Sequence, residues 1–400
     1  MLGKRAAYGG NDMTERRLLL AICMAGTALA SLAPVHASPT DVLIGLDSKV
    51  TYGVQGQQNV APGADAVLVM DISNPAHPRI RASLPLANSL LGPPTNLQIT
   101  PDGRLGLIAN SVNNVQDGAA WKVAPDDKLH VVDLNANPPK LIDTVTVGKQ
   151  PSGLSISRSG KLMLIANRAG KSVTALSIEG TAVKVLAEIP MGNEVAAVAI
   201  TPDGKRAFAV MNLVNKVGVL AIDGQTVTYD KALDIPAAVN PYNIDITPDG
   251  KHAFVSCTGA GGNNGDAIVT IDTAGPHPHV TSIMTAGRGA EGFAVAPNGK
   301  WAVTPLLQGS GDKQTDWSFT RNGEAVLLTI APNGTLTTGS RLPLGGLPEG
   351  LAYSADSQWV YIGNYIDQSI QVFRIAGGKM AAAGTLKLPG QPASLRGMAR

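Results

Sequence analysis

The stretch "VAITPDGKRAFAVMN", from Val198 to Asn212, returns 45 residues later as "NIDITPDGKHAFVSC", from Asn243 to Cys257. Repetition at a fixed interval is typical of repeat architectures, in which each copy is one structural unit packed against its neighbours. The turn inside the repeat occurs six times, as "TPDGR" from Thr100, "SRSGK" from Ser157, "TPDGK" from Thr201 and from Thr247, "APNGK" from Ala296 and "SADSQ" from Ser354. Six related units are therefore visible in the sequence.

Each turn is flanked by short segments with the pattern of β-strands. An alternating segment such as "LSIS" precedes the turn, "LMLIAN" follows it, and segments such as "SVTALSI" and "VKVLAEI" complete the unit. Four short strands joined by tight turns predict one antiparallel sheet. Because such a sheet cannot bury both of its faces alone, we expect the units to stack radially as the blades of a β-propeller.

The two ends of the chain complete one further blade. Before the first turn, "DVLIGLD", "DAVLVMDIS" and "RIRASLPL" supply three strands of a blade that lacks its innermost strand, and "GQPASLRGMA" after the sixth unit matches only that strand. The sequence therefore predicts an all-β, seven-bladed β-propeller with four-stranded antiparallel blades. Its ring is closed by pairing of the N- and C-terminal strands, and we number the blades from the N-terminus. The Pro-Asp-Gly turns are expected to be structural, because Pro presets φ, Asp bonds nearby amides and Gly accepts positive φ.

The beginning of the chain has the pattern of an export signal. Arg16 and Arg17 precede the apolar run "LLLAICMAGTALASLA", and small residues at Val35 and Ala37 favour cleavage before Ser38. We therefore predict a signal peptide over residues 1–37, with the true start at Met13, and a single propeller domain over residues 38–400. The mature chain is expected to be periplasmic or secreted, with no membrane span. Cys257 is then its only cysteine, so no intrachain disulfide forms.

Composition agrees with a turn-rich β protein and narrows the partners. The chain has 45 Gly, 27 Pro and 16% charged residues, with a net charge of +2. This small net charge gives no electrostatic reason to expect nucleic acid as a partner. A small molecule, a peptide or an envelope protein is the expected partner.

The strand ends of the units resemble those of the YVTN-repeat β-propellers, a family that overlaps the seven-bladed lactonase-like propellers. "LIAN" at Leu107 and Leu164, "AVMN" at Ala209 and "YIGN" at Tyr361 stand where that family has Tyr-Val-Thr-Asn. The resemblance covers essentially the whole mature sequence and implies the propeller fold. It implies no catalytic motif, because the family includes binding proteins and enzymes.

The loops that enter the inner strands place two carboxylates at equivalent positions. Aligning these loops gives one column with Tyr242, Glu291 and Glu349, together with Thr95, Ser152, Ala196 and Ala393. If the column points to the axis, the two glutamates of neighbouring blades face one small space. Paired carboxylates can perform acid–base chemistry, hold a divalent cation or bind a cationic ligand. Arg288 precedes Glu291 by three residues and can neutralise the pair or hold an anionic group; a solvated rim is the alternative.

Loops between the second and third strands supply further candidates. The segments 47–65, 109–128 and 305–323 are long and 257–266 is intermediate, which predicts a wall on one side of the funnel, formed by the contiguous blades five, six, one and two. Trp121 and Trp317 lie in two of these loops, where they can stack on a ligand or anchor the loop. Tyr242, together with Asn96 and Glu194 in the loops that enter inner strands, completes the ligand-binding candidates. No resident metal or cofactor is predicted, apart from a divalent cation between Glu291 and Glu349.

Two functions fit these residues. One is an exported propeller that binds a ligand or partner at its axial funnel without catalysis. The other is a lactonase-like hydrolase in which Glu291 or Glu349 activates water and Arg288 polarises the carbonyl or positions an acidic group. The isolated histidines give no cluster near the funnel, which disfavours haem, copper and Ser-His-Asp chemistry.

Overall fold

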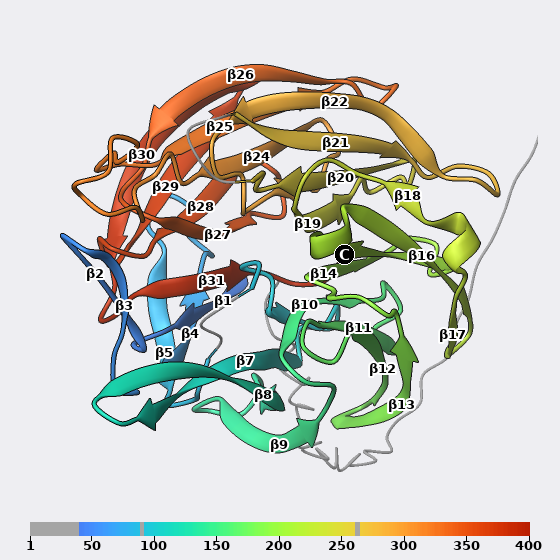
Figure 1. Ribbon diagram of the computed structural model, residues 1–400, viewed down its shortest axis with the longest axis horizontal. Helices are drawn as coiled ribbons and strands as arrows, with labels where there is room; N and C mark the ends of the chain where they lie inside the picture. Colours follow the sequence, from blue (N-terminus) through green and yellow to red (C-terminus); the bar gives the residue numbers. More distant parts are fainter. Residues whose placement is uncertain (1–39, 89–91, 261–264) are drawn as a thin grey trace, which may run out of the picture. The chain divides into compact units, whose positions relative to one another are not determined.

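The computed structural model confirms a ring of seven four-stranded antiparallel blades (Figure 1). It describes residues 40–88, 92–260 and 265–400, so the predicted signal peptide lies outside the described residues. Blade one contains β31 (Pro392–Arg396), β1 (Asp41–Leu46), β4 (Ala66–Asp71) and β5 (Arg79–Leu84), in that order from the axis outward. The ring is therefore closed by pairing of β31 with β1, as the two terminal fragments predicted.

Blades two to four follow in chain order. Blade two contains β6 (Leu97–Ile99), β7 (Leu105–Asp117), β8 (Ala120–Asp133) and β9 (Lys140–Thr146). Blade three contains β10 (Pro151–Ile156), β11 (Leu162–Asn167), β12 (Ser172–Glu179) and β13 (Ala182–Pro190). Blade four contains β14 (Ala197–Ile200), β15 (Arg206–Met211), β16 (Lys216–Asp223) and β17 (Thr226–Tyr229), and β18 (Ile235–Pro236) also pairs with β16. Short 3-10 helices lie at Asn212–Val214 and Lys231–Leu233.

Blades five to seven complete the ring. Blade five contains β19 (Pro241–Ile246), β20 (His252–Cys257), β21 (Asp266–Asp272) and β22 (His279–Gly287). Blade six contains β23 (Ala294–Val295), β24 (Trp301–Leu306), β25 (Glu324–Ile330) and β26 (Leu336–Pro343). Blade seven contains β27 (Pro348–Tyr353), β28 (Trp359–Asn364), β29 (Ser369–Ala376) and β30 (Lys379–Lys387).

The hydrophobic core lies between successive blades. Val173 of β12 and Leu220 of β16, for example, belong to one buried cluster that joins blades three and four. Inner and middle strands are largely buried on both faces, as in β11, whereas the outer strands are mostly exposed or half-buried, as in β22. Each blade thus buries its apolar side chains only against its neighbours, as a radial stack requires.

The repeated turns have the structural role that the sequence predicted. In the turn at Thr201, the Thr201 hydroxyl donates to Asp203 at 2.6 Å, and the backbone N–H of Lys205 donates to the same carboxylate oxygen at 3.0 Å. The same pair of hydrogen bonds forms around Asp102 and Asp249. These aspartates therefore close turns between the first and second strands.

The predicted wall of loops needs two corrections. Segment 109–128 is largely a regular two-stranded extension of β7 and β8, paired from Val112 with Pro125 to Asp117 with Ala120, not an irregular loop. Segment 47–65 also contains a hairpin, formed by β2 (Val50–Gly53) and β3 (Gly56–Asn59). In addition, the four blades are not contiguous, because blade seven, with a short β28–β29 connection, stands between blades six and one.

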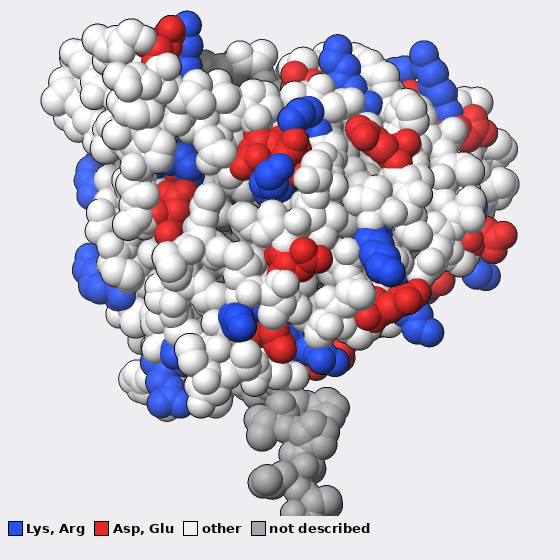
Figure 2. Space-filling view, turned by 90° about the horizontal axis from the view of Figure 1, so that it is seen from below, with Lys and Arg blue, Asp and Glu red and all other residues white. Residues whose placement is uncertain are grey.

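The surface has a mixed charge distribution. On the side of the ring in Figure 2, acidic and basic side chains are interspersed. In the described part of the chain, no helix combines the length and the hydropathy needed to cross a bilayer.

Candidate functional site

A cavity of about 520 Å³ opens at one mouth of the ring, where the inner strands begin. We call it the funnel. Glu291, Glu349, Tyr242 and Ala393 of the predicted column line it. The other three members do not; Ser152 and Ala196 are fully buried, and Thr95 borders a separate small cavity. Four of the seven blades therefore present the column residue to one space.

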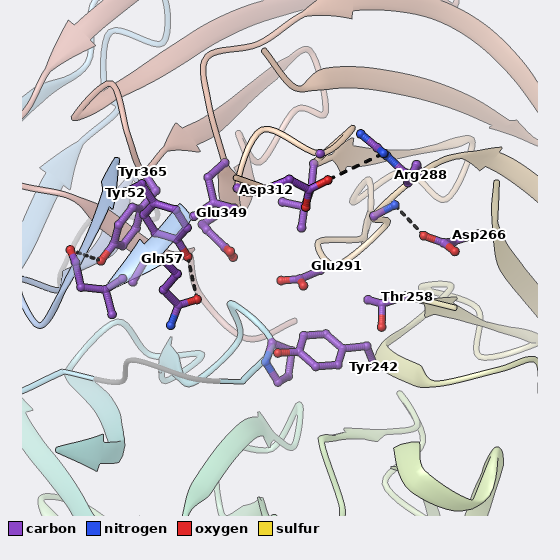
Figure 3. A pocket seen from close by; sticks show the side chains of 18 of the residues that line it. Tyr52, Gln57, Tyr242, Thr258, Asp266, Arg288, Glu291, Asp312, Glu349 and Tyr365 are labelled. Atoms are coloured by element: carbon purple, nitrogen blue, oxygen red, sulfur yellow. Dashed lines mark hydrogen bonds and ion pairs between the residues drawn. The ribbon is translucent and has the colours of Figure 1, made fainter. Parts of the chain in front are cut away.

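The two glutamates reach this space from neighbouring blades. Glu349 is the second residue of β27, and Glu291 lies three residues before the start of β23 (Figure 3). The Glu291 carbonyl accepts a hydrogen bond from the Ser256 hydroxyl at 3.3 Å, which fixes the backbone there. Gly350 has φ of +70°, and a Cβ at this position would lie 2.4 Å from the backbone nitrogen of Leu395. Glycine after Glu349 therefore permits the close approach of β27 and β31 that brings the glutamate to the axis.

The environment of the glutamate pair favours protonation. Burial raises the pKa of Glu291 to about 7, with the charge of Asp266 adding to the effect and that of Arg168 opposing it. Burial, and then the charge of Glu291, raise the pKa of Glu349 well above its usual range. Among the described residues, neither carboxylate forms an ion pair or accepts a side-chain hydrogen bond. Burial and the charge of the neighbouring glutamate thus shift this pair of carboxyl groups toward the protonated form.

Arg288 lies in the funnel, but its hydrogen bond and its ion pair are formed with residues other than the two glutamates. Its Nη2 donates to the Ser318 carbonyl at 2.6 Å, and its Nη1 lies 3.8 Å from Asp312. The side chain is buried, and its Nε and Nη1 have no hydrogen-bond partner. Arg288 therefore lies at the wall formed by segment 305–323, with Nη1 facing Asp312 and Nε without a partner. The cation whose charge acts on Glu291 is Arg168.

Arg168 was not predicted from the sequence. Its guanidinium carbon lies 5.6 Å from the centre of the Tyr242 ring, and its Nη2 lies 3.8 Å from Glu194. Arg168 directly follows the strand-end motif "LIAN" of blade three, as Tyr365 follows "YIGN" in blade seven. Reading the repeat one residue beyond each strand end finds both residues, because equivalent positions face the same end of the ring.

One side of the funnel is an aromatic wall that the sequence did not reveal. The rings of Tyr52 and Tyr365 pack edge to face with centroids 5.7 Å apart, and the Tyr52 hydroxyl donates to Gln57 at 3.2 Å. Tyr52 and Gln57 come from hairpin β2–β3. Burial, with the charges of Glu349 and Glu291, raises the pKa of Tyr52, so its hydroxyl stays protonated. This wall can donate hydrogen bonds and contact the apolar face of a ligand.

A buried lysine holds the base of this hairpin. Lys49 is 1% exposed, and its Nζ contacts Asp65 and donates to Asp47 at 3.4 Å and to the Asn88 carbonyl at 2.7 Å. Burial raises the pKa of Asp47 to about 7, against the opposing charge of Lys49. The ion cluster fixes the start of segment 47–65 and so positions Tyr52.

Not all predicted site residues line the funnel. Asn96 does, and its amide nitrogen donates to the Ala109 carbonyl at 2.8 Å. Trp121, Trp317 and Glu194 lie outside the lining; the Trp317 side chain is 81% exposed, and Glu194 pairs with Arg168. Segment 109–128 contributes no residue to the lining, so only three of the four predicted wall segments reach the cavity.

Carboxylates dominate the charged lining. Asp266, Asp312 and Asp316 line the funnel with the two glutamates, and Arg288 is the only cation in this lining of described residues. Burial raises the pKa of Asp266, which also accepts a hydrogen bond from the backbone of Gly289 at 2.6 Å. No group of three or more His, Cys, Asp or Glu side chains suited to a metal ion occurs among the described residues. The funnel thus favours neutral or cationic molecules rich in hydrogen-bonding groups.

Comparisons with known proteins support the fold. No protein-family model matches the chain, and no curated protein matches its sequence. Among solved structures, a putative 6-phosphogluconolactonase from Bacteroides fragilis is similar over 89% of this chain and 97% of its own, with a TM-score of 0.66 and 17% identity. A periplasmic gluconolactonase from Pseudomonas aeruginosa is similar over 89% and 98%, with a TM-score of 0.63 and 16% identity. A Kuenenia stuttgartiensis hydrazine synthase chain is similar over 72% and 78%, with a TM-score of 0.57 and 19% identity.

These identities show a shared fold and not a shared activity. The resemblance to lactonase-like propellers is thus supported at the level of architecture. The finer YVTN-repeat assignment has no matching family model.

Proposed function

We propose that this chain is an exported β-propeller that binds a small polar molecule, uncharged or cationic, in the funnel. The observation that carries the proposal is the pair Glu291 and Glu349, partly exposed to the cavity and without a protein partner among the described residues. Buried carboxyl groups normally have hydrogen-bond partners in the protein, so a pair without them suits a ligand that supplies donors.

The dimensions of the site favour a small molecule over a protein partner. A cavity of about 520 Å³ falls in the range that encloses metabolites of the size of a sugar. Its lining combines the aromatic wall of Tyr52 and Tyr365 with carboxyl groups and the guanidinium of Arg288. This combination suits a polyhydroxylated ring, whose faces are apolar and whose edges carry hydroxyl groups. Export is supported by the residue pattern of positions 1–37.

A second candidate, lactone hydrolysis, is favoured by the pKa of Glu291. A carboxylate that titrates at about 7 can take a proton from water as it attacks a lactone carbonyl. Protonated Glu349 can then give a proton to the ring oxygen as the acyl C–O bond breaks, which yields the hydroxy acid. The putative 6-phosphogluconolactonase and the periplasmic gluconolactonase among the structural neighbours make sugar lactones the natural first substrates to test.

One experiment separates the two functions. Thermal shift and calorimetry would use glucono-1,5-lactone, glucose and Ca²⁺, with acid release from the lactone followed in a pH-stat, for wild type, Glu291→Gln and Glu349→Gln. We expect the glutamine substitutions to weaken binding about tenfold, because each replaces an ionisable carboxyl group by an amide that keeps the shape but cannot take a negative charge. Glu179→Gln, at the exposed end of β12, is the matched control.

The outcomes differ for each function. Binding without acid release above the spontaneous rate supports a binding protein, and release that is lost in Glu291→Gln supports a hydrolase. Binding that is equal in wild type and both funnel variants would remove the glutamate pair from the site. Absence of binding of all three probes would count against a small neutral or cationic ligand.

A further inference from the structure

The repeat that places the glutamates at one mouth of the ring also forms a second ring of side chains. Three residues after each column position, the inner strands carry Gln98, Ser155, Asp245 and Arg396 in four blades and alanine in the other three. All seven positions line a cavity of about 190 Å³. Turn prolines such as Pro202 and Pro248 also line it, so it opens at the mouth opposite the funnel, on the side of the repeated turns. We call this cavity the lower cup.

Three polar members of this ring join neighbouring blades. The side-chain oxygens of Gln98, Ser155 and Asp245 accept hydrogen bonds from the backbone N–H groups of Ile156, Ile200 and Val295, at 3.2, 3.1 and 2.8 Å. In each case the donor belongs to the inner strand of the next blade. These side chains are thus accounted for by the architecture of the ring.

Arg396 departs from this pattern. It belongs to β31 of blade one, yet its Nη1 donates to the carbonyl of Leu154 in blade three at 2.6 Å. Its side chain therefore passes the neighbouring blade two and lies in the axial opening. Arg400, which follows β31, also lines the cup, and its Nη2 donates to the Tyr353 carbonyl at 3.4 Å. The chain end lies near the centre of the ring in Figure 1.

The two arginines form no ion pair among the described residues. The arginine ion pairs found among the described residues all involve other arginines. Asp245 is the acid nearest to them in the lining, but its oxygens accept from the backbone of Ile246 at 2.9 Å and of Val295 at 2.8 Å. Burial lowers the pKa of Arg396 and of Arg400; the charge of Asp245 opposes this shift in both, and the charge of Arg400 adds to it in Arg396. By its accessible surface, Arg396 is half-buried and Arg400 is exposed at the opening of the cup. An anion between them would favour the charged form of both guanidinium groups.

Tyr353 supplies an independent indication of a ligand. Its side chain is 4% exposed and lines the cup, and its hydroxyl has no hydrogen-bond partner. Burial raises the pKa of Tyr353, with the charge of Arg400 opposing and that of Asp245 adding to the effect. A buried hydroxyl without an acceptor is destabilising, and it is available to an oxygen that enters the cup.

We propose that the lower cup is a second binding site, separate from the funnel, for a small oxyanion held by Arg396, Arg400 and the Tyr353 hydroxyl. Guanidinium groups donate paired N–H bonds to carboxylate or phosphate, and a protonated phenol adds one more donor. The volume of about 190 Å³ admits inorganic phosphate or a short carboxylate. Because Arg396 belongs to β31, an anion bound to it contacts the strand that closes the ring.

The test is calorimetric titration of the protein with inorganic phosphate and, separately, with malonate. Wild type is expected to bind at least one of them, and the probe that binds distinguishes a phosphate site from a carboxylate site. Tyr353→Phe removes only the unpartnered oxygen and Arg400→Gln only the second guanidinium, and each should weaken binding about tenfold. Arg374→Gln, on the exposed face of β29, is the matched control and should bind as wild type does.

Two results would overturn the proposal: no heat of binding with either anion in wild type, or equal affinities in wild type, Tyr353→Phe and Arg400→Gln. Glu349→Gln separates this site from the funnel, because the substitution should leave anion binding unchanged whatever it does to funnel ligands. Circular dichroism of the variants checks that Tyr353→Phe and Arg400→Gln remain folded, so that weaker binding reports on the cup itself.

Discussion

At the scale of single residues, equivalent positions of the repeat have different chemical roles. The column that holds Glu291 and Glu349 in two blades holds Ser152 and Ala196, both fully buried, in two others. A repeat constrains the backbone, and the side chain at an axial position is then free to serve a site. At both glutamates of this column, burial raises the pKa and so opposes ionisation of the carboxyl group. Such a cost to stability is common at functional sites.

The raised pKa values predict a pH-dependent stability difference for Glu349→Gln. Between the unfolded-state pKa of about 4.5 and the higher folded-state pKa, the folded protein binds more protons than the unfolded chain. The free energy of unfolding therefore falls as pH rises through this window, and glutamine removes that loss. We expect Glu349→Gln to match wild type at about pH 4 and to exceed it by about 1–3 kcal/mol at about pH 8.

Urea denaturation at the two pH values measures this difference, with Glu179→Gln as the exposed control. The comparison with wild type is essential, because Asp47, Asp245 and Asp266 also have raised pKa values and contribute to the slope of the wild type. A constant difference between Glu349→Gln and wild type at both pH values would contradict the raised pKa.

At the scale of elements, two insertions in neighbouring blades support one another. Asn114 of β7 is 4% exposed, and its amide nitrogen donates to the carbonyls of Lys49 at 2.7 Å and Val60 at 2.9 Å, on either side of hairpin β2–β3. The β7–β8 extension therefore holds the hairpin that carries Tyr52, although it contributes no residue to the funnel lining. Its function is to position the aromatic wall.

Asn114→Ala should loosen this hairpin. The substitution removes the donor to the Val60 carbonyl and one of the two donors to the Lys49 carbonyl, which also accepts from the Val60 N–H. We expect it to lower the free energy of unfolding by about 1–3 kcal/mol. Binding of any ligand that stacks on Tyr52 should weaken several-fold. Gln116→Ala, at an exposed position of the same strand, should change neither quantity. Equal effects of the two substitutions on stability and binding would show that the extension does not support the hairpin.

At the scale of the whole molecule, the ring depends on its last strand. β31 pairs with β1 over Leu43–Leu46, and Leu395 is 1% exposed. Leu395 packs in one cluster with Ile44 of blade one and Tyr361 of blade seven. The Tyr361 hydroxyl also donates to the Pro75 carbonyl at 2.9 Å, a further contact between these two blades. Closure therefore joins the two ends of the chain by both hydrogen bonds and apolar burial.

Leu395→Ala should destabilise the entire ring. Removing a fully buried leucine side chain costs about 2–5 kcal/mol in well-packed cores. Thermal unfolding should show a lower midpoint in one transition, because opening the closure exposes both neighbouring blades. Leu213→Ala is the control, since Leu213 is 67% exposed. Truncation after Pro389, which removes β31 altogether, should have a larger effect; an unchanged melting temperature after truncation would contradict closure by this strand.

The sequence by itself determined the blade and its number. Pro-Asp-Gly turns and strand periodicity are local signals, and equivalent positions of seven units must face the same end of the ring, which brought Glu291, Glu349, Tyr242 and Asn96 to the funnel. Only the tertiary structure decided what surrounds them. Tyr52, Asp312 and Tyr365 come from connections whose lengths and paths differ between blades, and Arg168 and Arg288 find partners across blade boundaries. Such contacts follow from packing between segments distant in sequence, which no local pattern encodes.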